Sequence, residues 1–342
     1  MLKKFNCCTN DVIFVDGLWG TGKSLIAPIV SAMEGVEKQK IEHIYEYLCV
    51  LIFLNKIEED AADTLLKIYA DLSQYNNLIG REVNFRWHDS SGPRINPNSL
   101  RYIQRMFGQE GDAIIEEINE NNLALNVMSH TIAQVSKPLV KAYGNRLKII
   151  EMVRHPVYMV RHWYSYLSRF DSEREFTISL DYEGQKVPWY AESWKNEFIR
   201  MSIMDRSLYS IIHLYDLLFE SLDYLAEQNA KVLVLSFESF VMETEDSLEK
   251  LQKFLDRSHS NKINTILKQQ KIPRKQLSQG LNQFLGQASY GWKKSETNFE
   301  QEEYENYLEF IQKEASENYL QEFESLISKY NLPPQFKDFA AK

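Results

Sequence analysis

Residues 17–24, Gly-Leu-Trp-Gly-Thr-Gly-Lys-Ser, have the spacing of a loop that wraps a phosphate group. They fit the pattern G-x-x-x-x-G-K-[ST] between a short apolar run and an amphipathic segment, the strand–loop–helix context that makes the pattern specific. Glycines let backbone N–H groups turn toward an anion, and the start of the helix adds a positive end. We therefore expect phosphate binding by Gly17, Gly20, Thr21, Gly22, Lys23 and Ser24, with Lys23 as a point charge.

The loop alone does not choose the phosphate compound. An enzyme that uses a magnesium nucleotide also needs an acidic residue at the end of another strand to hold the metal. The expected strand at 147–153 ends in Arg154, and Glu151 and Glu238 are imperfect substitutes for that acid. The sequence also lacks metal-ligand spacings such as H-E-x-x-H or paired C-x-x-C. These features favour a phosphate-rich ligand bound without metal, and no metal site is expected.

A second anion site is predicted around residues 154–165, Arg-His-Pro-Val-Tyr-Met-Val-Arg-His-Trp-Tyr-Ser. Arg154 follows a predicted strand, and open parallel sheets bind ligands beyond the carboxyl ends of their strands. Pro156 suits the first position of a helix, whose amino end favours anions. His162 and Ser165 are three residues apart and therefore share a helical face.

Apolar runs predict buried strands at 11–16, 123–128, 147–153 and 231–235. Helices are expected at 23–34, 38–55, 58–75, 132–143, 156–170 and 245–255, in a long region ending near 229, and after 299. Segments 79–99, 171–188 and 270–294 are expected to be irregular. Alternating strands and helices indicate an α/β fold of the P-loop type, with a central parallel sheet flanked by helices on both faces. We expect one domain over 1–342, with helical insertions around 36–122 and 171–229.

Composition excludes several classes of protein. The 342 residues are 44% apolar and 25% charged, as in a globular protein, and the net charge of −9 disfavours a broad nucleic-acid surface. Three cysteines cannot form a disulfide framework. The N-terminus does not read as a signal peptide, and the longest apolar run, 47–54, is too short to span a membrane. We expect a cytoplasmic protein.

Several segments, in the same order along the chain, resemble the sulfotransferase family. Lys-Ile-Ile-Glu-Met-Val-Arg-His-Pro at 148–156 and the helix after it resemble the strand and Arg-x-Pro motif that holds the 3′-phosphate of 3′-phosphoadenosine 5′-phosphosulfate (PAPS). Residues 123–131 are similar to the segment with the catalytic histidine, which falls on His130. Residues 231–256 resemble a late strand and helix, and 289–311 the basic segment that closes over the nucleotide. The loop itself is closer to an ATP-type loop, so Lys23 matches the family's lysine by role rather than by position.

The resemblance implies PAPS as the sulfuryl donor, a hydroxyl-bearing acceptor and no metal. It assigns Lys23 and His130 to catalysis, with His130 as general base. Arg154, His162, Ser165, Lys293 and Lys294 would join the loop in binding the nucleotide. Arg86, His88 and Arg94, in the loop at 79–99, either line the acceptor pocket or belong to ordinary surface.

Two other functions remain open. The loop also suits a kinase or nucleotide hydrolase that uses ATP and magnesium, and a non-catalytic nucleotide-binding protein would keep the loop without the chemistry. Convergence of Lys23 and His130 on one pocket would separate an enzyme from the non-catalytic alternative. The sequence identifies neither the acceptor nor the oligomeric state.

Overall fold

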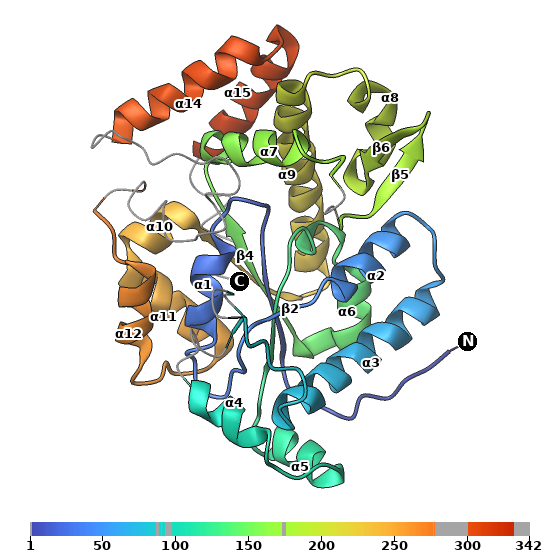
Figure 1. Ribbon diagram of the computed structural model, residues 1–342, viewed down its shortest axis with the longest axis vertical. Coiled ribbons are helices and arrows are strands. Elements are labelled where there is room, and N and C mark those ends of the chain that lie inside the picture. Colours follow the sequence, from blue (N-terminus) through green and yellow to red (C-terminus); the bar gives the residue numbers. More distant parts are fainter. Residues whose placement is uncertain are drawn as a thin grey trace.

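The computed structural model describes residues 2–86, 89, 91–92, 98–172, 176–275, 277 and 300–331. Its centre is a five-stranded sheet in the order β2-β3-β1-β4-β7, and every neighbouring pair is parallel (Figure 1). The strands are β1 (Val12–Asp16), β2 (Lys40–Ile41), β3 (Leu125–Met128), β4 (Leu147–Val153) and β7 (Lys231–Ser236). The chain is therefore an α/β protein with a parallel central sheet, as the sequence predicted.

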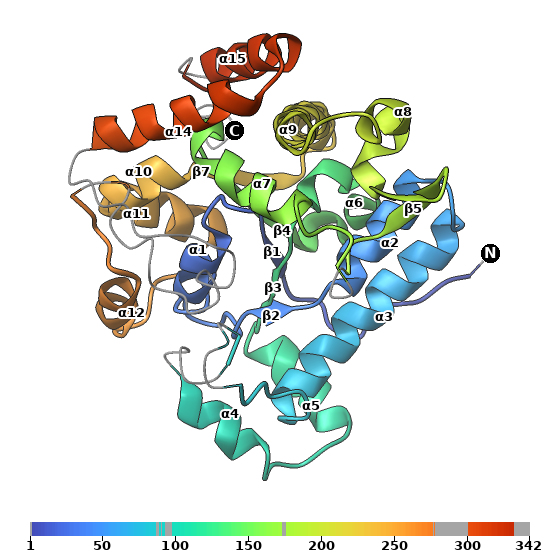
Figure 2. The ribbon, with the colours of Figure 1, turned by 45° about the horizontal axis from the view of Figure 1, so that its top comes forward.

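Helices cover both faces of this sheet (Figure 2). On one face lie α1 (Lys23–Val30), α10 (Phe237–Met242), α11 (Thr244–Leu255) and α12 (Ile263–Gln270). On the other lie α2 (Ile44–Phe53), α3 (Glu59–Leu78), α6 (Lys137–Tyr143), α7 (Val160–Leu167) and α9 (Ile203–Glu227). Strand β1 serves both cores, because side chains alternate along a strand. Val12 and Phe14 pack in the core of α2 and α9, while Ile13 and Val15 pack in that of α1.

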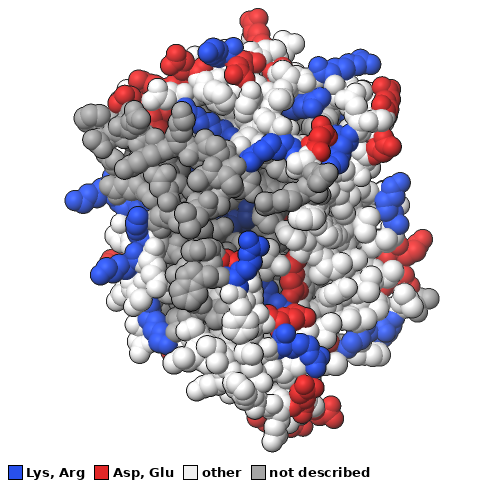
Figure 3. Space-filling model, viewed as in Figure 1, with Lys and Arg blue, Asp and Glu red and all other residues white. Residues whose placement is uncertain are grey.

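The remaining elements lie at the periphery. Helices α4 (Ser99–Arg105) and α5 (Asp112–Glu120) follow the partly described loop, and α8 (Lys195–Phe198) precedes α9. Helices α14 (Glu300–Glu314) and α15 (Glu317–Asn331) pack beside α7 and α9. Helix α14 has an acidic sequence, and carboxylates line the upper edge of the face in Figure 3. Over the rest of that face, acidic and basic side chains are intermixed.

The predicted strands are confirmed, and the predicted boundaries of several other segments are wrong. Residues 38–55, predicted as one helix, contain β2 before α2, and β2 is an edge strand of the sheet. The segment 171–188 is not irregular throughout, since β5 (Ser179–Tyr182) and β6 (Gln185–Pro188) form an antiparallel hairpin. Pro156 opens a 3₁₀ turn, Pro156–Met159, and α7 follows it. Helix α1 ends two residues after its internal Pro28.

Two further observations concern membranes and cysteines. Among the helices that the structure describes, none combines the length and apolar character needed to cross a bilayer. Cys7, Cys8 and Cys49 are free thiols.

Candidate functional site

The loop from Gly17 to Gly22 joins β1 to α1 at the carboxyl end of the central strand. Gly17 and Gly22 have φ values of +143° and +97°, which favour glycine. A Cβ at Gly17 would clash with the Met152 carbonyl oxygen, and one at Gly22 with the ring of Phe237. Thr21 closes the turn, because its backbone N–H and its hydroxyl both donate to the Leu18 carbonyl, at 3.2 and 2.8 Å.

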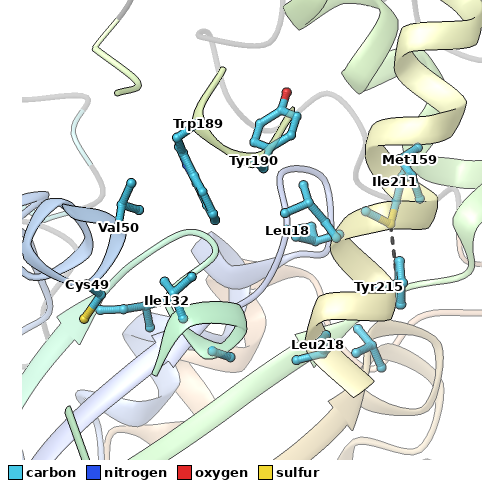
Figure 4. Close-up of a cluster of buried hydrophobic side chains, with 14 of the residues drawn as sticks. Leu18, Cys49, Val50, Ile132, Met159, Trp189, Tyr190, Ile211, Tyr215 and Leu218 are labelled. Atoms are coloured by element: carbon cyan, nitrogen blue, oxygen red, sulfur yellow. Dashed lines mark hydrogen bonds between the residues drawn. The ribbon is translucent and has the colours of Figure 1, made fainter. Parts of the chain in front are cut away.

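The side chain of Leu18 attaches the loop to the hydrophobic core. Leu18 is 1% exposed and belongs to the core beside α2 and α9, part of which is drawn in Figure 4. The loop is therefore held by an apolar contact on its inner side. Its glycines and the first amides of α1, which have no partner within the helix, can serve an anion.

Lys23 is 6% exposed, and its ammonium donates to the carbonyls of Gly17 at 2.5 Å and Leu18 at 2.9 Å. Burial lowers the pKa of Lys23 to about 8, against the opposing charges of Asp16 and Glu151. The lysine is therefore a desolvated cation held against its own loop. An anion bound at the loop would compete with these two carbonyls for the N–H groups of the Lys23 ammonium.

Two carboxyl groups lie beneath the loop. Asp16 accepts hydrogen bonds from the Ser129 hydroxyl at 2.8 Å and the Ala133 amide at 2.7 Å, and burial raises its pKa to about 6. Glu151 is fully buried opposite Asp16 in the strand register. Burial, with the charge of Asp16, raises the pKa of Glu151 well above its usual value. Burial thus favours the neutral form of the Glu151 carboxyl group, which makes Glu151 poorly suited to hold a metal ion.

Arg154 follows β4 and is 7% exposed. Its guanidinium donates to the carbonyl of Gly20 at 2.9 Å, so it adjoins the phosphate loop. Tyr215 of α9 fixes its backbone by donating to the Arg154 carbonyl at 2.6 Å. Within the described part of the chain, Arg154 forms no ion pair, and its buried Nε has no hydrogen-bond acceptor. The site thus holds a buried cation without a carboxylate partner.

A second arginine, which sequence reasoning missed, shares this site. The guanidinium of Arg274 lies 5.4 Å from the ring centre of Phe237, and that of Arg154 lies 4.3 Å from the same ring. Burial, followed by the charge of Arg154, lowers the pKa of Arg274 to about 10. Its Nε is also buried without an acceptor among the described residues. The only sequence signal was a lone arginine after a proline in a segment expected to be irregular.

His162 and Ser165 lie on α7 with different surroundings. His162 is half-buried beside Gly20, and burial with the charges of Lys23 and Arg154 lowers its pKa to about 3. It is therefore a neutral donor or acceptor between the two cationic sites. The Ser165 hydroxyl instead accepts a hydrogen bond from Arg169 at 2.8 Å, so its predicted role in anion binding requires that contact to change.

His130 follows β3 and is 19% exposed. Its ring lies 5.6 Å from that of Trp19, the third residue of the loop sequence. Burial and the charge of Lys23 lower the pKa of His130, while Glu46 opposes them. The Lys23 ammonium is thus near enough to His130 to act on its pKa. The neutral imidazole predominates at pH 7.

Sequence reasoning also missed Glu46 and Trp19. Glu46 is 6% exposed on α2 and accepts hydrogen bonds from the His130 amide at 3.3 Å and the Thr131 hydroxyl at 3.1 Å. Trp19 stacks on Tyr166 of α7 at 4.8 Å. Glu46 could have been found from one local signal. It is the single acid among the apolar and aromatic residues of α2, Ile-Tyr-Glu-Tyr-Leu-Cys-Val.

His43, Glu46 and His130 place potential metal-ligand atoms within 4.8 Å of one another. The oxygens of Glu46 already accept two hydrogen bonds, and the charge of Lys23 acts on both Glu46 and His130. A nearby ammonium disfavours an additional cation. We therefore interpret these residues as a hydrogen-bonded cluster.

The other predicted site residues are not brought to this site by the described part of the structure. His88, Arg94, Lys293 and Lys294 lie outside the described residues. Arg86 is exposed, and it contacts Asn84 and Asp89 of its own loop.

Ser24, in contrast, lies at the site, since it is half-buried in the first turn of α1 beside Lys23.

No protein-family model matches the sequence, and no curated protein shows significant sequence similarity to it. Several solved sulfotransferase structures are similar in fold. The sulfotransferase domain of the olefin synthase from Synechococcus PCC 7002 aligns over 100% of this chain and 95% of its own, with 11% identity and a TM-score of 0.38. The sulfotransferase domain from the curacin biosynthetic pathway aligns over 75% and 77%, with 12% identity and a TM-score of 0.37. Sulfotransferase STF1 from Mycobacterium tuberculosis H37Rv aligns over 82% and 78%, with 10% identity and a TM-score of 0.37.

These likenesses are remote, and the α/β class rests on the parallel sheet itself.

Proposed function

We propose that this protein is a sulfotransferase that moves a sulfuryl group from PAPS to a hydroxyl-bearing acceptor. The observation that carries the proposal is a pair of cationic sites that both contact the phosphate loop. Lys23 donates to the carbonyl of Gly17, whereas Arg154 donates to that of Gly20 and shares the ring of Phe237 with Arg274. Such a pair suits a ligand with two separate phosphate groups.

The donor set fits this nucleotide. The guanidinium groups of the buried Arg154 and the half-buried Arg274 have no carboxylate partner among the described residues, and each has an unsatisfied Nε. They would bind a phosphate through charge-assisted hydrogen bonds. Lys23, Gly20, Gly22 and Ser24 would hold the group at the loop. When bound, PAPS supplies an activated sulfuryl group. Lys23 would then donate to the oxygen on which negative charge develops, an interaction that stabilises a transition state.

His130 would act as the general base. Its lowered pKa keeps the imidazole neutral at pH 7, ready to accept the proton of the acceptor hydroxyl. A base in this position typically contributes about 10²–10⁴-fold to the rate. Because the charge of Lys23 acts on the pKa of His130, proton removal and anion stabilisation would take place in the same site.

An ATP- and magnesium-dependent kinase or hydrolase is less well supported by the geometry. Of the two acids that were candidates for holding the metal, Glu151 is fully buried with a raised pKa. Glu238 accepts hydrogen bonds from the His155 amide at 3.0 Å and the Tyr330 hydroxyl at 2.7 Å. One acid is therefore desolvated and the other already accepts two hydrogen bonds, which disfavours both as metal ligands.

Calorimetric titration with 3′,5′-adenosine bisphosphate, and with ATP in the presence and absence of magnesium, tests the donor. We expect the bisphosphate to bind at least tenfold more tightly than ATP, with no change on adding EDTA. Magnesium-dependent ATP binding without a preference for the bisphosphate would instead support the kinase.

The chemical step is tested by turnover of PAPS with a panel of hydroxyl acceptors. His130→Ala should bind the bisphosphate as the parent protein does and should lose at least a hundredfold in turnover. Undiminished turnover would remove His130 from the mechanism. Bisphosphate binding with no turnover on any acceptor would favour the non-catalytic alternative.

A further inference from the structure

Glu46 is a buried acid that the proposed reaction does not yet use. It occupies the third position of α2, a helix of otherwise apolar and aromatic residues, and it is 6% exposed. An ionised carboxylate is costly to bury unless it is paired and hydrogen-bonded. Its partners therefore indicate why it lies there.

Those partners belong to the segment that carries His130. One oxygen of Glu46 accepts from the His130 amide at 3.3 Å, and the other accepts from the Thr131 hydroxyl at 3.1 Å. The first oxygen also lies 3.8 Å from His130 Nδ1. Burial raises the pKa of Glu46, but its polar contacts with His130 and Thr131 more than offset this effect, so the pKa lies below its usual value. Glu46 is therefore ionised at pH 7.

The backbone at Thr131 shows that this segment is held under strain. Thr131 is fully buried and has a φ of +78°, in the left-handed region that β-branched residues rarely adopt. Strain of this kind costs on the order of 1–3 kcal/mol and persists only where surrounding contacts impose it. The hydrogen bond to Glu46 is one such contact, and it fixes the direction in which the preceding residue, His130, leaves the sheet.

We propose that Glu46 is a positioning residue that holds His130 with its proton on Nδ1, so that Nε2 accepts the proton of the acceptor hydroxyl. The proposal rests on the proposed function of His130 as general base. Because Nδ1 is the ring nitrogen near the carboxylate, Nε2 lies on the far side of the ring. A carboxylate beside one ring nitrogen sets which nitrogen carries the proton. Closing the 3.8 Å separation to hydrogen-bond distance requires only a small movement, as is common when a ligand binds.

A metal centre is the competing interpretation, since His43 completes a three-residue cluster. The hydrogen bonds already made by Glu46 and the nearby charge of Lys23 favour positioning. The same experiment distinguishes the two.

The test compares Glu46→Gln, Glu46→Asp and a control, Glu58→Gln, whose side chain is exposed. The ring nitrogens of His130 are observed by ¹⁵N NMR on the full protein, in EDTA and without nucleotide. Their signals are assigned as those that disappear in His130→Gln. We expect the parent to show the Nδ1–H tautomer of His130, Glu46→Gln to lose that preference, and the control to keep it. An unchanged tautomer in Glu46→Gln would overturn the proposal.

Turnover gives the second measurement. Glu46→Gln should lower kcat at least tenfold, change the affinity for 3′,5′-adenosine bisphosphate less than twofold, and be partly rescued in Glu46→Asp. Equal losses of kcat and of bisphosphate affinity would indicate general damage and overturn a positioning role. If the parent shows neither turnover nor bisphosphate binding, the proposed function fails, whereas the tautomer comparison still decides the role of Glu46.

Two additions keep the test decisive. If Glu46→Gln does not fold, Thr131→Gly is used instead. It removes the hydroxyl that donates to Glu46, at a position whose φ suits glycine. It should lower kcat without weakening the binding of the bisphosphate. Zinc is then titrated into the parent. Stoichiometric shifts of the His43 and His130 signals that vanish in Glu46→Gln would establish a metal centre and overturn the proposal.

Discussion

Arg154 and Arg274 share the ring of Phe237, with their guanidinium groups 4.3 and 5.4 Å from its centre. Each is a cation–π contact, yet together they bring two like charges close in a partly buried site. The charge of Arg154 contributes to the lowered pKa of Arg274. Like charges repel, and no carboxylate among the described residues pairs with either group. A bound phosphate would relieve this repulsion, which explains an arrangement that is otherwise unfavourable.

The first prediction follows from this pair. Arg154→Ala and Arg274→Ala should each weaken binding of 3′,5′-adenosine bisphosphate by roughly 10–150-fold, because each removes hydrogen bonds to a charged group of about 1.5–3 kcal/mol. Both variants should bind adenosine 5′-monophosphate with little change, so that the preference for the bisphosphate is lost. Calorimetry with the two nucleotides measures this preference.

The matched control is Arg161→Ala. Arg161 is exposed on α7, and its guanidinium lies over Tyr307, away from Phe237. It should leave the preference for the bisphosphate intact. If Arg154→Ala weakened the binding of both nucleotides equally, this arginine would not be the group that binds the second phosphate.

The second prediction concerns pH. Since burial lowers the pKa of Lys23 to about 8, its ammonium is present below that value and is lost as the pH rises through it. The affinity for the bisphosphate should therefore fall between pH 7 and 9, and binding near pH 8.5 should take up a proton. Calorimetry in buffers of different ionisation enthalpy measures that uptake. Lys23→Met should bind more weakly and without pH dependence over this range; a parallel fall in this variant would assign the effect to another group.

The acid side gives a third prediction. His130 must be neutral to accept a proton, and its pKa lies below 6.5. The fall of kcat/KM on the acid side should therefore have its midpoint below pH 6.5. A profile that already declines at pH 7.5 would indicate a base with a higher pKa than His130 has here.

Much of the fold was predictable because its signals are local. The strands at 12–16, 125–128, 147–153 and 231–236 are continuous apolar runs, as expected for strands buried on both faces. The phosphate loop was predictable from its glycines, which the backbone geometry at Gly17 and Gly22 requires. Strand β2 was missed because it has only two residues and pairs with β3, a contact distant in sequence.

The site was predicted less completely, for a similar reason. Arg154 and His130 follow strands directly, so their positions at the carboxyl edge of the sheet could be inferred. Arg274 and Glu46 act through partners far away in the chain, respectively Phe237 and the segment at 130–131. No local pattern encodes such contacts.

The fourth prediction concerns the buried Glu151. Since burial raises the pKa of Glu151 and favours its neutral form, Glu151→Gln should preserve the shape of the side chain and shift the melting temperature only slightly. Glu151→Ala leaves a cavity beneath the loop and should destabilise the protein by about 2–4 kcal/mol. Thermal unfolding at pH 7 compares the two. A large loss in Glu151→Gln would mean that Glu151 is ionised and serves as the counter-charge of Lys23.

The fifth prediction concerns the ion pair that anchors α4. Glu37 is 1% exposed and accepts two hydrogen bonds from Arg105, at 2.6 and 2.9 Å, and one from the Tyr102 hydroxyl at 2.9 Å. Burial raises the pKa of Glu37, but Arg105 more than offsets it, so the pKa is lowered. The pair therefore stabilises the fold above pH 4.5, and that contribution is lost as the pH falls through the lower pKa of the folded state.

Glu37→Gln should accordingly destabilise the protein by about 3–5 kcal/mol at pH 7, because Arg105 is left buried without its counter-charge. The difference in free energy of unfolding between parent and variant should shrink below pH 4.5, where the parent carboxylate becomes protonated. Urea unfolding at several pH values measures it. Glu59→Gln is the control, since the Glu59–Lys141 pair is exposed and should contribute no measurable stability. A difference for Glu37→Gln that stays constant from pH 7 to 3 would show that packing, rather than charge, holds α4 in place.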